Sequence, residues 1–147
     1  FMCASILLGA CTPSEDPDAS WDVTVTGTET SCVSDTTGYL ENYTYDVFQE
    51  ATQIKIFIDD SLFATGQLRG CFIEYQSAAY LEDNPEGRFT WDISGRADVQ
   101  GVAGGCDLPE GMDWQGTETL TVLDSEHPDI VPGCTYSMSV EGTYKSN

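Results

Sequence analysis

Basic residues are scarce in this chain of 147 residues. Five lysines and arginines stand against 25 aspartates and glutamates, so the formal net charge is −20. Nucleic-acid-binding proteins need clustered cations that displace counterions from the phosphate backbone, and this class is therefore excluded. A strongly acidic surface instead favours solubility, the binding of cations or the attraction of a basic protein.

Catalytic motifs are also missing. The sequence contains no G-x-S-x-G nucleophile motif, no P-loop and no G-x-G-x-x-G fingerprint. The single histidine, His127, stands in an acidic segment beside Pro128, where a solvent-exposed side chain is the simpler interpretation and a metal ligand the alternative. The length and the hydrophobic fraction of 40% are those of one globular domain with its own core. The sequence thus predicts a folded domain without identifying a reaction.

The first ten residues, 1–10, are uncharged and mostly apolar, but a membrane-spanning helix needs about 20 such residues. They fit the apolar part of a secretory signal, whose basic start we expect to precede Phe1. The stretch ends in Leu8-Gly9-Ala10-Cys11, which resembles the lipobox of bacterial lipoproteins. The resemblance implies that Cys11 becomes the mature N-terminus and carries diacylglycerol and palmitate. The alternative is a buried strand with Cys11 in an ordinary disulfide.

Residues 11–20 have the composition of a flexible tether. They contain two prolines and three acidic residues without apolar periodicity. Thr12 stands where an aspartate favours retention of lipoproteins in the inner membrane, so the resemblance implies the outer membrane as the location. We therefore expect an exported protein of the bacterial cell envelope, held on the lipid bilayer through Cys11.

Four cysteines remain for the folded domain once those of the signal and the lipobox are set aside. They are Cys32, Cys71, Cys106 and Cys134. No two of them form the close C-x-x-C pair that a zinc site would use. An even number of cysteines in an exported chain favours two disulfides.

Residues 21–147 form a single β domain in this interpretation, because apolar and polar side chains alternate with the period of two that strands show. The clearest case is the segment 87–99, where Phe89, Trp91 and Ile93 alternate with polar residues. The segment 61–79 is too long for one strand, and Gly70 offers the turn that would divide it. The expected strands cover residues 21–31, 43–49, 52–58, 61–68, 71–79, 87–99, 114–123 and 134–144.

These strands predict an all-β fold, a closed eight-stranded antiparallel up-and-down barrel. An even number of alternating strands lets the first pair with the last, which removes exposed edges. A β-sandwich is the alternative. Alternation also places the cysteines pairwise at the two ends of the barrel, which predicts the disulfides Cys32–Cys134 and Cys71–Cys106. In outline the barrel resembles the lipocalins, whose sequence signature is absent.

Acidic loops gather at one end of the predicted barrel, opposite the tether. Calcium prefers several carboxylate and carbonyl oxygens, so this rim is a candidate Ca²⁺ site or a surface that steers a basic protein. The ordered EF-hand spacing is absent, and solvation alone is the simpler explanation of the charge. The loops cover residues 32–42, 59–60, 80–86 and 124–133. The candidate metal ligands are Asp83, Glu86, Asp124, Glu126 and Asp129.

Glu29 and Glu118 are the candidate interior carboxylates. Each stands in the tetrapeptide Gly-Thr-Glu-Thr, at an even distance from the apolar residues of its strand, so strict alternation points both inward. Two inward carboxylates could serve as an acid/base pair, as in glycoside hydrolysis. The alternative is solvent contact or pairing with Arg96, because an unpaired buried carboxylate is costly.

Three functions fit these observations. The first expectation is a membrane-anchored, non-enzymatic binding or structural module of the cell envelope, without a cofactor unless the rim holds Ca²⁺. The second is an acidic inhibitor or partner of a basic envelope protein, similar in design to lysozyme inhibitors. The third is a hydrolase that uses the interior carboxylates. An interior filled by Trp91, Trp114, Phe89 and Tyr136 would leave no room for a substrate and exclude the third.

Overall fold

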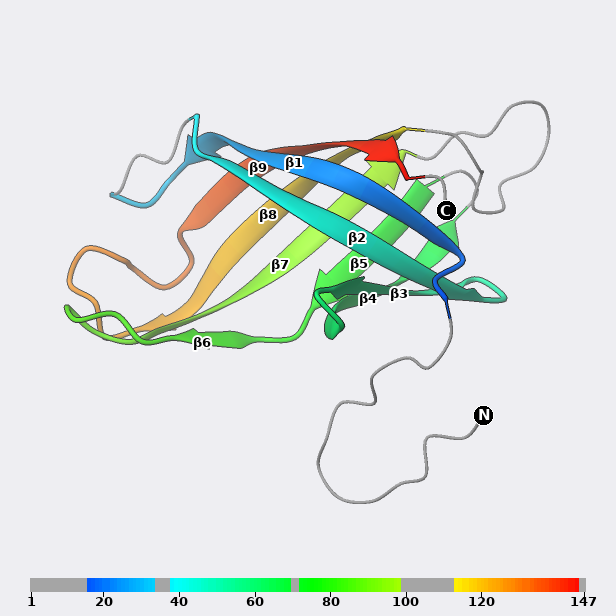
Figure 1. Cartoon of the computed structure of the whole chain (residues 1–147). Coiled ribbons are helices and arrows are strands. Elements are labelled where there is room, and N and C mark those ends of the chain that lie inside the picture. Colours follow the sequence, from blue (N-terminus) through cyan, green and yellow to red (C-terminus); the bar gives the residue numbers. More distant parts are fainter. Residues whose placement is uncertain (1–15, 34–37, 70–71, 99–112, 146–147) are drawn as a thin grey trace, which may run out of the picture.

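The computed structural model describes residues 16–33, 38–69, 72–98 and 113–145. Within these ranges the regular structure consists of nine strands and no helix (Figure 1). None of the described residues therefore forms a helix that is long and apolar enough to cross a membrane. The strands are β1 (Ala19–Thr30), β2 (Leu40–Glu50), β3 (Gln53–Ile58), β4 (Ser61–Arg69), β5 (Phe72–Ser77), β6 (Tyr80–Glu82), β7 (Phe89–Asp98), β8 (Trp114–Ser125) and β9 (Thr135–Tyr144).

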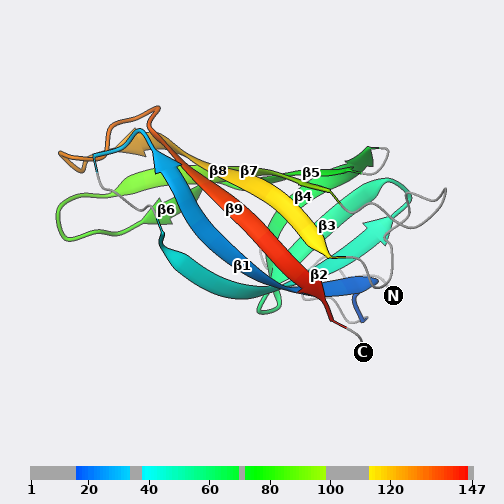
Figure 2. The ribbon, with the colours of Figure 1, turned by 90° about the horizontal axis from the view of Figure 1, so that it is seen from above.

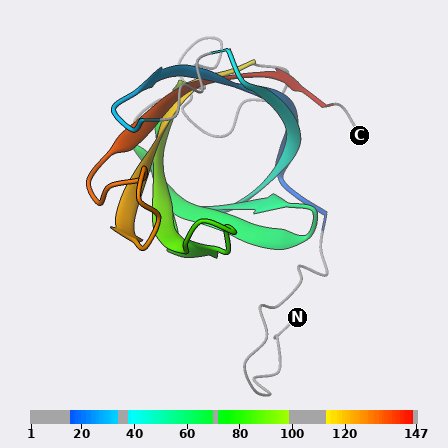
Figure 3. The same cartoon turned by 90° about the vertical axis from the view of Figure 1, so that its left-hand side faces the viewer.

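The sheet closes on itself. Its strands follow the order β5-β4-β3-β2-β1-β9-β8-β7-β6, and β5 also pairs with β7, so that eight strands form a ring. The extra strand, β6, pairs with the first residues of β7, on the same edge that β5 occupies further along. All pairings are antiparallel, and the end view in Figure 3 shows the ring. The predicted eight-stranded up-and-down barrel is confirmed. The alternative of a β-sandwich is wrong, because the pairing of β5 with β7 closes the sheet into a ring.

Two short connections reverse the chain between β3 and β4 and between β4 and β5. Between β3 and β4 only Asp59 and Asp60 connect the paired residues Ile58 and Ser61, and both aspartates have positive φ angles, of 50° and 61°. This is the conformation of a two-residue hairpin turn that asparagine, aspartate and glycine favour. The division of 61–79 is also confirmed, because Arg69 pairs with Phe72 across β4 and β5.

The structure differs from the expected elements at several boundaries; β2, for example, begins at Leu40, inside the expected loop 32–42. Two of the differences change an interpretation. The segment 80–86, predicted to be a loop, contains the short strand β6 (Tyr80–Glu82), which pairs with β7. The barrel also begins earlier than residue 21. Ser20 is buried and donates to Asp46 Oδ1 at 2.6 Å, and the Asp18 amide donates to Val47 O, so the end of the expected tether is part of the sheet.

The two ends of the barrel differ in packing. At the end where β1 begins and β9 ends, the interior is filled by a core around Trp21 and Trp114, whose ring centroids lie 5.3 Å apart. The opposite end carries the connections between β1 and β2, β3 and β4, β5 and β7, and β8 and β9 (Figures 1 and 2). The described parts of the acidic segments expected at one end therefore do share it, opposite the start of β1. We call this the loop end.

A disulfide ties two connections together at the loop end. Cys32, just after β1, is bonded to Cys134, just before β9, with a Cα–Cα distance of 5.1 Å. This confirms one of the two predicted bridges. The other, Cys71–Cys106, and the lipidation residue Cys11 lie outside the described residues and stay predictions.

Candidate functional site

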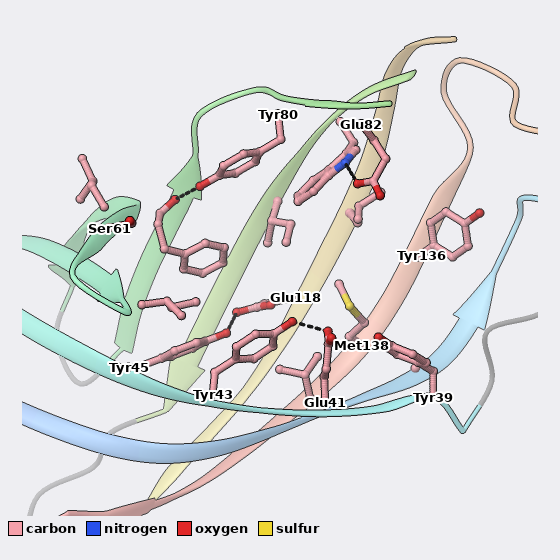
Figure 4. A pocket seen from close by; sticks show the side chains of 18 of the residues that line it. Tyr39, Glu41, Tyr43, Tyr45, Ser61, Tyr80, Glu82, Glu118, Tyr136 and Met138 are labelled. Carbon is pink, nitrogen blue, oxygen red and sulfur yellow. Dashed lines mark hydrogen bonds between the residues drawn. The ribbon is translucent and has the colours of Figure 1, made fainter. Parts of the chain in front are cut away.

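A cavity of about 740 Å³ occupies the half of the barrel toward the loop end. The aromatic core around Trp114 fills the other half, so the cavity has a floor instead of running through the barrel. Aromatic and aliphatic side chains from the strands make up most of its wall. The lining residues are Val25, Gly27, Tyr39, Glu41, Tyr43, Tyr45, Ile58, Ser61, Leu62, Phe63, Tyr80, Glu82, Phe89, Trp91, Ile93, Glu118, Leu120, Tyr136 and Met138 (Figure 4).

The floor is a cluster of aromatic rings that the strands bring together from separate parts of the sequence. Trp114 of β8 packs against Tyr45 of β2 and Tyr75 of β5, with centroid distances of 5.6 and 6.0 Å. Large interlocked rings of this kind bury much apolar area and have few alternative packings. The floor is therefore rigid, and the polar ends of the two tyrosines are held in fixed positions.

Glu118 of β8 lies at the bottom of the cavity, and only 2% of its surface is exposed. Its Oε1 accepts two hydrogen bonds, from the Tyr45 hydroxyl at 2.7 Å and from the Tyr75 hydroxyl at 2.6 Å. Within the described part of the chain, no hydrogen bond reaches Oε2. One oxygen of the carboxylate is thus fixed by the protein while the other is left for a group in the cavity.

A glycine lets Tyr75 reach this carboxylate. Gly95 of β7 pairs with Tyr75 on one side and with Glu118 on the other, so the three residues lie in one row across the sheet. A Cβ atom on Gly95 would overlap with the Tyr75 ring and hydroxyl. Only glycine leaves room for the tyrosine side chain to cross β7 within the barrel.

Burial raises the pKa of the Glu118 carboxyl, because charge is unfavourable in an apolar surrounding, and the hydrogen bonds from Tyr75 and Tyr45 lower it by a smaller amount. Burial, together with the nearby Glu118, raises the pKa of both tyrosines well above the ordinary value. The tyrosines therefore stay protonated and remain donors to the carboxylate at any physiological pH.

Two more carboxylates stand higher in the cavity. Glu41 of β2 and Glu82 of β6 are exposed, and both belong to the acidic rim that the sequence predicted. Glu41 accepts a hydrogen bond from the Tyr43 hydroxyl, and Glu82 accepts one from Trp91 Nε1 at 3.3 Å (Figure 4). The cavity thus has carboxylates near its mouth and one at its floor.

The expectation that Glu29 also points inward is wrong. The register between β1 and β9 shifts between Gly27 and Glu29, and this irregularity breaks the strict alternation on which the prediction rested. Gly27 lines the cavity, but Glu29 is exposed. The predicted acid/base pair of Glu29 and Glu118 is therefore not assembled. Arg96, the expected partner of such a carboxylate, is exposed and lies over the Phe72 ring at 4.0 Å.

Of the five predicted calcium ligands, the structure brings together only Glu86 and Asp129, beside His127. Asp83 pairs with Arg88 at 2.8 Å, and Glu86 pairs with His127 at 2.9 Å. Among the described residues, the only group of metal-ligating side chains consists of Glu86, His127 and Asp129. His127 Nδ1 already accepts a hydrogen bond from the Asp129 amide, and an imidazole is not a ligand that calcium prefers. This cluster connects two loops, and nothing further is assigned to it.

Sequence reasoning missed the aromatic wall. Tyr39, Tyr43 and Tyr45 are separated by even numbers of residues, so a strand would place them on one face, and Tyr80 stands in a segment predicted to be a loop. A signal was present in β2, where every second residue from Glu41 to Tyr45 faces inward. One charged and two amphipathic side chains on an inward face indicate a polar interior. The barrel interior is not filled by Trp91, Phe89 and Tyr136, the arrangement that would have left no room for a ligand. These residues line its cavity.

Comparisons with protein-family models, with curated proteins and with solved structures find no match for this chain. A barrel of this kind serves many unrelated functions, because function resides in the site and not in the fold. The function is therefore argued from the cavity and its chemistry.

Proposed function

We propose that this chain is an exported, lipid-anchored binding protein of the cell envelope, whose barrel cavity takes up a small and largely apolar molecule without converting it. The cavity of about 740 Å³ carries the proposal. Ligand sites in proteins have volumes of about 300–1,000 Å³ and combine an apolar lining with a few placed polar groups. An eight-stranded barrel is also just wide enough to hold one small ligand.

Binding is favoured over catalysis by the groups that face the cavity. The buried carboxylate, Glu118, is held by two tyrosines that do not lose their protons, and its predicted partner Glu29 lies outside. A carboxylate mechanism of glycoside hydrolysis needs a second carboxyl across the scissile bond. Glu41 and Glu82 are exposed near the mouth, where water surrounds their charge. The arrangement suits recognition of a ligand.

The binding test uses the neutral fluorescent probe N-phenyl-1-naphthylamine, whose emission rises in an apolar site. Leu120 lines the cavity, whereas Leu123 on the same strand is exposed. We expect the wild-type domain and the Leu123→Trp variant to bind the probe equally, and the Leu120→Trp variant to lose binding because the indole fills the cavity. Equal binding by both variants would mean that the probe lies elsewhere and would refute the proposal.

The anchor is tested separately. The chain is produced in a bacterium behind a basic signal start and labelled with an alkyne analogue of palmitate. The lipobox resemblance of Leu8-Gly9-Ala10-Cys11 predicts label and membrane association in the unchanged chain, and loss of both in the Cys11→Ser variant. A soluble, unlabelled product from the unchanged chain would refute the anchor and leave the cavity proposal intact.

A further inference from the structure

We infer that the cavity recognises an organic ammonium ion with an apolar body, whose positive nitrogen binds beside Glu118 at the floor. The inference rests on the proposed binding function and specifies the class of its ligand. It follows from three independent features of the cavity, which are its charge, the state of the Glu118 carboxylate and the aromatic character of its wall.

The charge of the cavity has one sign. Glu41, Glu82 and Glu118 line it, and no lysine, arginine or histidine does so among the described residues. The protein as a whole carries a net charge of −20. An acidic cleft with low-dielectric walls concentrates cations and repels anions. A ligand with a carboxylate head, such as a fatty acid, would therefore meet repulsion without a compensating cation among the described lining residues.

The Glu118 carboxylate is prepared for a partner. Two tyrosine hydroxyls fix Oε1, while Oε2 makes no hydrogen bond with any described residue. A carboxylate that is 2% exposed gains much from an opposite charge, because the attraction is little weakened by water. An ammonium group within hydrogen-bonding distance of Oε2 would supply both that charge and the missing donor.

The wall above Glu118 is suited to a cation with an apolar body. Tyrosine, tryptophan and phenylalanine rings line it from five strands, and aromatic faces attract organic cations by about 0.5–2 kcal/mol in general. Tyr80 and Trp91 pack with ring centroids 4.7 Å apart on one wall, and Phe63 packs on Tyr45 of the floor, with centroids 5.7 Å apart. These rings would enclose the apolar body, while carboxylates near the mouth attract the ligand as it enters.

Three probes with the same body separate charge from shape: 4-phenylbutylammonium, 4-phenylbutanol and 4-phenylbutyrate, measured by calorimetry on the oxidised domain. We expect the ammonium ion to bind at least about tenfold more tightly than the alcohol, and the carboxylate to bind most weakly. The Glu118→Gln variant should lose this preference and keep its affinity for the alcohol. The Glu141→Gln variant, which removes one charge from an exposed position on β9, should behave as wild type.

The two proposals fail in different ways. If neither N-phenyl-1-naphthylamine nor the alcohol binds, the binding function itself is refuted. If they bind but the ammonium ion binds no more tightly than the alcohol, only the inference about the cation is refuted. The same holds if Glu118→Gln lowers the affinities for the ammonium ion and the alcohol equally. A basic protein such as lysozyme that binds while the small ammonium ion does not would also overturn it, in favour of a protein partner at the acidic rim.

Discussion

The hydroxyl of Tyr75 lies 2.6 Å from Glu118 Oε1, although a whole strand, β7, separates the two residues in the sheet. The tyrosine crosses β7 at Gly95, where a side chain would occupy the same space. The absence of a side chain at Gly95 thus allows Tyr75 to donate one of the two hydrogen bonds that Glu118 accepts. The first predictions concern this contact.

Gly95→Ala should destabilise the domain by about 1–3 kcal/mol, because an added methyl group would overlap with the Tyr75 ring and force it from its position. Chemical denaturation measures this change in the free energy of unfolding. In a double-mutant cycle with Tyr75→Leu, the two changes should be strongly non-additive, since removal of the ring removes the overlap. Additive effects would show that Gly95 matters for another reason.

Tyr75→Phe and Tyr45→Phe should each lower the free energy of unfolding by about 1–3 kcal/mol near neutral pH, because each removes one donor from a buried carboxylate. The loss of unfolding free energy should be smaller in acid, because a protonated, neutral Glu118 accepts weaker hydrogen bonds than a carboxylate does. Tyr144→Phe is the matched control, because no described residue makes a hydrogen bond with its hydroxyl. An equal loss in the Tyr144→Phe variant would assign the effect to general packing.

The barrel follows from the sequence because alternation, turn residues and strand number all point to the same closed sheet. Alternation also identifies Glu118 as an inward carboxylate. It fails for Glu29, because the register shift after Gly27 is a local property of the paired strands that no single-strand pattern records.

The cavity is harder to predict than the barrel. Whether Trp91 and Tyr136 fill an interior or line it depends on how large side chains from opposite strands divide the space, and this is a property of the whole ring. The contact between Tyr75 and Glu118 needs the register of three strands at once. A search for glycines opposite large aromatic residues in the expected pairing would have indicated it.

Loss of the Cys32–Cys134 disulfide should cost up to about 4–5 kcal/mol in the chain-entropy account, because the bond closes a loop with a sequence separation of 102. The Cys32→Ser/Cys134→Ser variant is compared with the oxidised protein in a denaturant titration. The same variant tests the second predicted bridge. If Cys71 and Cys106 are bonded, a thiol assay on the domain of residues 16–147, folded under oxidising conditions and then denatured, should find no free thiol, and two free thiols would refute that pairing.

The stability of the protein should depend on pH through Glu118. Burial raises the pKa of this carboxyl in the folded state above the unfolded value of about 4.3, so the folded state binds the proton more tightly. The facing groups, Tyr45 and Tyr75, stay protonated and add no titration of their own below alkaline pH.

It follows that the free energy of unfolding of the wild type, measured relative to Glu118→Gln, is highest below the unfolded pKa. It then falls as the pH rises through the folded pKa. Melting curves of both proteins from about pH 4 to pH 8 measure this difference, since the other carboxylates are common to both and cancel. Saturating 4-phenylbutylammonium should reduce the fall, because a bound cation stabilises the ionised carboxylate and lowers its pKa. A difference that stays constant across this range would show that Glu118 titrates alike in the folded and unfolded chain, and would contradict the burial on which its role at the floor of the cavity depends.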